Sequence, residues 1–286
     1  MSDPEPKAPP RPPTRSARRP EASTRLSAVQ IHDNVLAGAE KELERSSFSL
    51  FFSSLASGLA IGFSFLVGGY LMTLVPDGWG MAAAAAAYPI GFIFVIMGRS
   101  ELFTENTLTP VLAVLDRRDL QSFLGMLRLW GILLVGNLLG TFIYAWVVAR
   151  TTALAPELHP ELLKLAGHAT AGGFGDILYK AVFAGWLIAL LTWLLAATVD
   201  TFAQLTLIWI CTAAISALGF RHAVVGSVEA FYRAFRAGDY GWGHAFGDFV
   251  VPAVIGNAIG GVLLVALLNY AQVRPERPPS AQSDGE

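Results

Sequence analysis

Apolar residues in this chain gather into six long stretches that contain no Asp, Glu, Lys or Arg. These stretches are 19 to 31 residues long and cover residues 46–76, 78–98, 129–149, 181–199, 201–220 and 249–273. A helix needs roughly 20 residues to cross a hydrocarbon core of about 30 Å. The pattern therefore predicts an all-α membrane protein with six transmembrane helices, in a transmembrane domain over residues 47–273.

The polar segments at the two ends of the chain differ in character. Residues 1–27 are rich in Pro, Arg, Ser and Glu, and a segment of this composition is expected to form a disordered tail. Residues 28–46 alternate apolar and charged positions, which predicts an amphipathic helix on the membrane surface or against a partner subunit. Residues 274–286 form a second polar tail.

Basic residues near the spans predict the orientation of the chain. The N-terminal tail, the 116–119 loop with the nearby Arg128, and the C-terminal tail fall on one side of six spans and hold most of the Lys and Arg. Cytoplasmic loops carry an excess of these residues. We therefore expect a multi-pass protein of the cytoplasmic membrane with both termini in the cytoplasm.

Composition narrows the classes of function. Charged residues make up 15% of the chain, against about 25% in a typical soluble domain, which argues against a soluble enzyme. The single cysteine, Cys211, excludes a disulfide framework and a multi-cysteine metal site. No P-loop, Rossmann fingerprint or nucleophile motif is present, so we expect no enzyme activity, cofactor or metal. Basic residues lie in tails and loops rather than in a stripe, so no nucleic-acid partner is expected.

A weak internal repeat divides the apolar part into two halves of three spans. The motifs GNLLG at 136–140 and GNAIG at 256–260 lie 120 residues apart. Gly98 pairs with Gly219 at a separation of 121 residues, and Gly62 with Gly185 at 123. Because each half has an odd number of spans, the second half is expected to cross the membrane upside down. Inverted repeats of this kind are typical of transporters and channels.

Polar clusters interrupt the second and fifth spans. Residues 98–106 are followed by a further apolar segment at 107–115, and residues 219–222 by another at 223–230. Non-helical backbone at membrane depth is tolerated only where protein or a water-filled cavity satisfies it. We therefore expect two broken helices whose breaks line a pathway.

Three motifs resemble those of the formate/nitrite transporter family. Residues 98–106, GRSELFTEN, resemble the family's Leu-Phe-Thr loop, and residues 219–222, GFRH, resemble its Gly-Phe-x-His element. Residues 256–261, GNAIGG, resemble its Gly-Asn-x-x-Gly-Gly signature. The resemblance covers roughly residues 30–272 and indicates a less characterised branch.

The resemblance implies an aquaporin-like fold and a homopentamer in which each protomer has its own pore through the lipid bilayer. Relatives pass small monovalent weak-acid anions, often with a proton. His222 matches the family's pore histidine, Thr104 the loop threonine that faces it, and Asn257 the pore asparagine of the last span. The positions that match the apolar constrictions are Tyr88, Phe92, Leu102, Phe103, Ile188 and Ile215.

Three positions depart from the family's pattern. Gly185 stands where many members have a second pore asparagine. The outer-vestibule lysine that many members carry before the fourth span is unmatched, although His168 lies near its place. Arg221, directly before the histidine, is an unusual residue at that position.

The chemistry of weak acids explains why such a pore would use a histidine. An anion faces a large desolvation penalty in an apolar pore, whereas the neutral acid crosses at lower cost. Histidine has an ordinary pKa of about 6.5, near working pH, so His222 is a candidate proton donor or attractor for the anion. The alternatives are a core histidine that bonds backbone carbonyls, a helix-capping Thr104, and an Asn257 that bonds between helices.

Four charged residues flank the breaks, and we expect them to fix the loops through ion pairs rather than to contact substrate. They are Arg99, Glu101, Glu105 and Arg221. The sequence as a whole predicts channel-like transport of a small weak-acid anion, in which a proton would accompany the anion through His222. Two alternatives stay open: an aquaporin-type pore for neutral solutes, whose Asn-Pro-Ala motifs are absent, and a non-conducting membrane scaffold or sensor.

Overall fold

The computed structural model describes residues 25–276, and every regular element in that range is helical. The predicted tails at 1–24 and 277–286 lie outside the described residues. The first half comprises α1 (Ala28–Glu44), α2 (Ser47–Ala60), α3 (Gly62–Met72), α4 (Gly80–Ala87), α5 (Pro89–Met97), η1 (Glu105–Thr107), α6 (Thr109–Arg117) and α7 (Leu120–Arg150). The second half comprises η2 (Pro156–Leu158), α8 (His159–Ala169), α9 (Phe174–Leu195), α10 (Thr201–Ala217), α11 (Ala223–Arg236), η3 (His244–Val250), α12 (Val251–Gly261), η4 (Val262–Leu267), α13 (Leu268–Val273) and η5 (Arg274–Glu276).

Five helical segments of the described chain are long and apolar enough to cross a membrane. They are Ser47–Met72, Gly80–Met97, Leu120–Arg150, Phe174–Leu195 and His244–Glu276. The helix in the predicted fifth stretch, α10, is apolar but has 17 residues and is shorter than these. The six predicted spans thus correspond to five segments of full length and one shorter helix.

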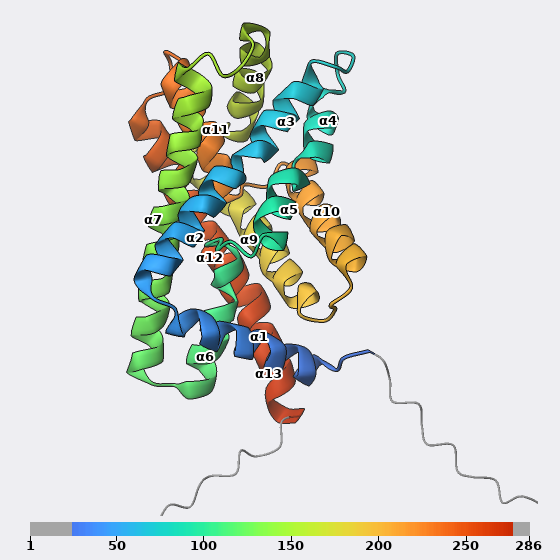
Figure 1. Ribbon diagram of the computed structural model, residues 1–286, viewed down its shortest axis with the longest axis vertical. Coiled ribbons are helices and arrows are strands. Elements are labelled where there is room, and N and C mark those ends of the chain that lie inside the picture. The colour runs from blue at the N-terminus through green and yellow to red at the C-terminus, as the bar shows by residue number, and fades with distance from the viewer. Residues whose placement is uncertain (1–24, 277–286) are drawn as a thin grey trace, which may run out of the picture.

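The helix α1 lies across one end of the bundle, beside α6 and α13 (Figure 1). It begins with a capping box in which Ser27 accepts from the backbone N–H of Gln30 and the Gln30 side chain accepts from the backbone N–H of Ser27. Its buried face includes Val35 and Ala39. A helix thus occupies Ala28–Glu44 of the segment expected to be amphipathic, and it packs against the protein's own helices.

The second and fifth helices are broken, as predicted. The chain leaves α5 after Met97, runs without regular structure to Thr104, and resumes through η1 into α6. It leaves α10 after Ala217 and resumes at Ala223 in α11. Arg99 has φ 56° and Gly219 has φ 67°, so these two residues, 120 apart, occupy equivalent turns. The expected pairing of Gly98 with Gly219 is therefore displaced by one residue.

Each half contains one closely packed pair of helices, and the two pairs are built in equivalent ways. In the first half α2 packs along α7, and in the second half α9 packs along α12. A Cβ at Gly58 would overlap the carbonyl of Asn137, and a Cβ at Gly185 would overlap the carbonyl of Asn257. Gly58 is thus the structural counterpart of Gly185, and the expected pairing of Gly62 with Gly185 is wrong.

Candidate functional site

The first break is held by the side-chain amide of Asn137 on α7. Its Oδ1 accepts a hydrogen bond of 2.8 Å from the backbone N–H of Phe103. Its Nδ2 donates to the carbonyls of Ser54, at 2.8 Å, and Glu101, at 3.0 Å. All three bonds are buried. One amide therefore satisfies two backbone groups of the break, those of Glu101 and Phe103, and ties the break to the Ser54 carbonyl on α2.

Asn257 on α12 holds the second break in the same way. Its Oδ1 accepts from the backbone N–H of Ala223 at 2.8 Å. Its Nδ2 donates to the carbonyls of Ala181, at 2.7 Å, and Arg221, at 3.0 Å. Since these bonds occupy the amide and Asn257 is fully buried, the geometry corresponds to the interhelical alternative for this residue. The matching Asn137, in the repeated motif, is its counterpart.

The two breaks meet at Thr104 and His222. Thr104 Oγ1 lies 2.8 Å from His222 Nε2, and both side chains are buried. The backbone N–H of Val225 donates to His222 Nδ1 at 3.2 Å, which makes the imidazole the N-cap of α11. Because Nδ1 accepts this bond, we assign the proton of the neutral imidazole to Nε2, which then donates to Thr104 Oγ1. Thr104 makes no side-chain capping bond to η1.

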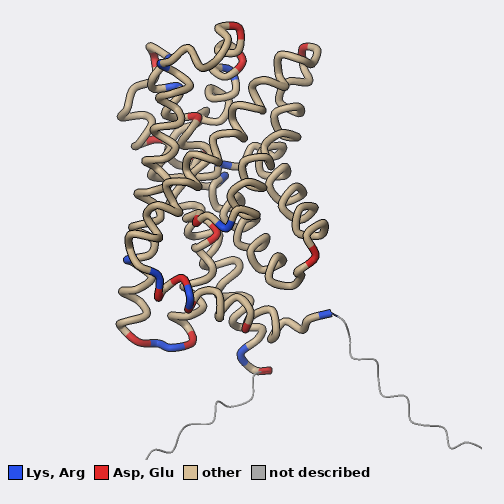
Figure 2. The backbone as a smooth tube through the Cα atoms, viewed as in Figure 1, with Lys and Arg blue, Asp and Glu red and all other residues tan. Residues whose placement is uncertain are grey.

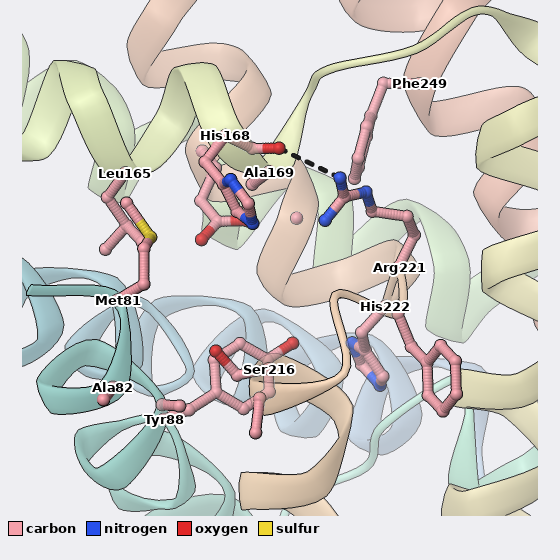
Figure 3. A pocket seen from close by; sticks show the side chains of 15 residues that line it. Met81, Ala82, Tyr88, Leu165, His168, Ala169, Ser216, Arg221, His222 and Phe249 are labelled. Atoms are coloured by element: carbon pink, nitrogen blue, oxygen red, sulfur yellow. Dashed lines mark hydrogen bonds between the residues drawn. The ribbon is translucent and has the colours of Figure 1, made fainter. Parts of the chain in front are cut away.

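Two cavities approach this contact from opposite ends of the molecule. The first, which we call the Arg221 cavity, has a volume of 320 Å³. Its polar lining residues are Tyr88, His168, Ser216, Arg221, His222 and Glu229, most of which are labelled in Figure 3. The second, the Glu101 cavity, has a volume of 510 Å³ and is lined on one side by residues of α1. Its charged lining residues are Lys41, Glu42, Arg45, Arg99, Glu101 and Glu105.

An apolar section separates the two cavities. Tyr88, the N-cap of α5, lines the first cavity, and Ile96 on α5 lines the second. Phe92, one turn from each, lines neither and is fully buried. The Phe92 ring meets the His222 imidazole edge-on, with centroids 5.0 Å apart. The other positions matched to constrictions are also buried, namely Leu102, Phe103, Ile188 and Ile215.

The charged residues beside the breaks have different surroundings. Glu101 forms an ion pair with Arg45 and accepts a hydrogen bond of 3.0 Å from Asn106 Nδ2. Arg99 and Glu105 line the same cavity. Arg221 instead donates to the carbonyl of His168 at 2.9 Å, and among residues 25–276 no carboxylate lies within ion-pair distance of it.

The structure gives a physical reason for two of the positions that depart from the family pattern. Gly185 packs directly on the Asn257 backbone, so this position has no room for a side chain such as asparagine. His168 lines the Arg221 cavity, and its carbonyl holds the Arg221 guanidinium. Burial, then the neighbouring Arg221 and Lys180, lowers the pKa of His168, so its ring is neutral at pH 7. Arg221 is therefore the fixed cation of this cavity.

Two site residues escaped prediction from the sequence. Glu229 lines the Arg221 cavity from α11, and Arg45 neutralises Glu101 from the segment that follows α1. A signal for Glu229 existed, since it is a carboxylate within the apolar segment that follows the second break. No such signal existed for Arg45, because its partner Glu101 lies 56 positions further along the chain.

Comparisons with known proteins agree with this architecture. The profile of the formate/nitrite transporter family matches residues 29–271. The inner membrane protein YfdC of Escherichia coli (strain K12) is 35% identical over 248 residues, which are 86% of this chain and 79% of YfdC.

Two solved structures share the fold. An FNT family ion channel superposes with a TM-score of 0.75 at 21% identity, over 85% of this chain and 98% of that chain. A pentameric formate channel with formate bound superposes with a TM-score of 0.65 at 16% identity, over 80% of this chain and 98% of that chain. The aquaporin-like helical fold, the two interrupted helices and the family profile lead to one assignment. This chain is a multi-pass membrane protein that belongs to the formate/nitrite transporter family.

Proposed function

We propose that this protein is a channel for small monovalent weak-acid anions of the formate and nitrite class, with one pore in each protomer of a homopentamer. The observation that carries the proposal is the Thr104–His222 contact between two helix breaks, at an apolar section with a cavity on either side. The family assignment and the likeness to a pentameric formate channel support the substrate class and the assembly.

The geometry supports a mechanism in which the anion crosses the apolar section as its neutral acid. An anion would lose its hydration between Phe92, Leu102 and Ile215, at a cost of several kcal/mol. With Nε2–H of His222 donating to Thr104, the hydroxyl hydrogen of Thr104 is free to donate to an oxygen of the solute. The Nδ1 atom of His222 is committed to the α11 cap, so the proton that neutralises the anion comes from solvent in the cavity.

Flux into proteoliposomes tests the function. We expect uptake of formate or nitrite that rises as external pH falls from 8 to 5, because the neutral acid is the crossing species. Acetate, lactate and hydrosulfide complete the panel. Glycerol or water permeation without anion flux would establish a neutral-solute pore instead, and no selective flux at any pH would leave a non-conducting scaffold.

Two variants test the contact between the breaks. His222→Phe removes both the cap and the donor to Thr104, and we expect it to abolish flux or alter its pH dependence. Thr104→Val removes the hydroxyl alone and is expected to lower flux at every pH. Thr212→Val is the matched control, since Thr212 is buried but bonds the Ile208 carbonyl one turn away. Equal losses in Thr104→Val and the control would remove the hydroxyl from the mechanism.

We also propose that the α1 end of the molecule faces the cytoplasm of an inner membrane. Basic residues gather at this end in Figure 2, as the positive-inside rule expects. Arg45 caps α1, Arg117 and Arg118 end α6, and Arg128 bonds the carbonyl of Arg45. Labelling of an Arg117→Cys variant in a Cys211→Ala background tests the orientation. Reaction of this cysteine with an impermeant reagent added outside intact cells would show that the α1 end faces outward, and would overturn the proposed orientation.

A further inference from the structure

Arg221 is a buried cation with unused hydrogen-bonding capacity. The residue is 6% exposed, and its Nε has no hydrogen-bond partner. One Nη2 hydrogen bond, to the His168 carbonyl, is the side-chain hydrogen bond that the structure gives it. Figure 3 shows the guanidinium beside that carbonyl at the cavity, with the neighbouring His222 imidazole below it. A guanidinium carries five N–H donors, and of these the Nε–H is both buried and without a partner, while one bond from Nη2 is the side-chain bond made to the protein.

The charges around the cavity do not account for these donors. Arg221 is the lining residue with a fixed charge, and Glu229, the lining residue with a carboxyl group, lies beyond ion-pair distance of the guanidinium. His168 and His222 present neutral rings, and Tyr88 a neutral phenol. Ordinary buried arginines are paired or fully hydrogen-bonded, because leaving a buried charge without a partner is costly. The arrangement is that of a site whose anion arrives from solution.

We propose that Arg221 forms a binding subsite for planar two-oxygen anions in the cavity directly above His222. The inference rests on the proposed function and names the feature that selects among its substrates. The flat fork of a guanidinium matches two coplanar oxygens with parallel N–H···O bonds, which a single-atom anion cannot make. Carboxylates and nitrite are therefore favoured over hydrosulfide and chloride at this entrance.

Glu229 lines the same cavity from α11, seven residues beyond His222. An ionised Glu229 would repel an anion bound at Arg221, whereas a protonated Glu229 carries no charge and leaves the guanidinium as the charge that acts on the anion. Burial of this carboxyl group favours the protonated form.

The experiment compares substitutions in reconstituted full-length protein, with formate, nitrite and hydrosulfide as probes. Arg221→Lys keeps the charge but loses the fork, and we expect the KM for formate and nitrite to rise about tenfold while that for hydrosulfide changes less than twofold. Arg236→Lys is the matched control, because Arg236 is the last residue of α11, the helix that follows Arg221, bonds one backbone carbonyl and does not line the cavity.

An unchanged ratio of formate to hydrosulfide KM in Arg221→Lys overturns the subsite while leaving the proposed function intact. If the wild type moves no anion, the proposed function fails and a binding measurement decides the subsite. In that measurement, formate but not chloride raises the unfolding temperature of detergent-solubilised wild type. Loss of this rise in Arg221→Gln supports the subsite, and an equal rise in both proteins refutes it.

Discussion

Replacing Asn257 with alanine should destabilise the protein by removing the support of the second break. The amide makes three buried bonds, to the N–H of Ala223 and the carbonyls of Ala181 and Arg221. Side-chain hydrogen bonds inside membrane proteins average about 0.6 kcal/mol and reach about 1.7 kcal/mol each. Three such bonds give an expected loss of about 2 to 5 kcal/mol in the free energy of unfolding.

Titration of the detergent-solubilised protein with dodecyl sulfate, followed by tryptophan fluorescence, measures this loss. Asn137→Ala should cost a similar amount, because Asn137 makes the equivalent three bonds at the first break. Asn269→Ala, in α13 and away from both breaks, is the control and should change stability by less than about 0.5 kcal/mol.

The two roles considered for Asn257 give opposite results. If the amide supports the break, stability and flux fall together in Asn257→Ala. A variant that unfolds like the wild type but conducts poorly would refute the structural role and place the amide in contact with the passing solute.

Two further perturbations probe the helix contacts and the α1 end. Gly185→Ala should destabilise the protein by about 1 to 3 kcal/mol, since its methyl group would overlap the Asn257 carbonyl. Gly131→Ala on α7 is the control, because its methyl group meets open space and should stabilise the protein slightly. Unfolding titrations that give the two variants equal stability would contradict the packing. Burial, then Glu101, raises the pKa of Glu42 to about 7, so the folded protein holds a proton there that the unfolded chain releases above its ordinary 4.5. Stability should therefore decline by at most about 3 kcal/mol as pH rises from about 4.5 to 7. Glu42→Gln should flatten this decline in a pH series of thermal unfolding. Parallel curves for wild type and variant would contradict the assignment of the decline to Glu42.

The elements of the fold could be predicted from the pattern of polar interruptions in apolar stretches. The polar clusters at 98–106 and 219–222 located both breaks, because membrane helices expel such residues unless protein satisfies them. The residue-by-residue correspondence between the two breaks was harder to predict from the sequence. A left-handed turn is most often marked by glycine, yet the first break places Arg99 there, so the glycine-based alignment slipped by one residue.

The contacts of the site depended on information outside local sequence. The pairing of Thr104 with His222 joins residues 118 positions apart, and only the family resemblance suggested it. Glu101 forms an ion pair, whereas Arg221 has no carboxylate within ion-pair distance among residues 25–276, and nothing in the sequence next to either residue distinguishes them. Which charge finds a partner is decided by distant segments, here the chain after α1 and the end of α8.

The two breaks share a backbone design but carry opposite charges at equivalent places. Glu101 and Arg221, 120 residues apart, each offer a carbonyl to a cradling asparagine, one at either mouth of the pore. Arg45 cancels the charge at the Glu101 mouth, whereas the guanidinium at the other mouth has no carboxylate within ion-pair distance among the described residues. A symmetric scaffold therefore holds an asymmetric electric field. Uptake of the anion should therefore saturate at a lower concentration when it enters from the Arg221 mouth than when it enters from the Glu101 mouth.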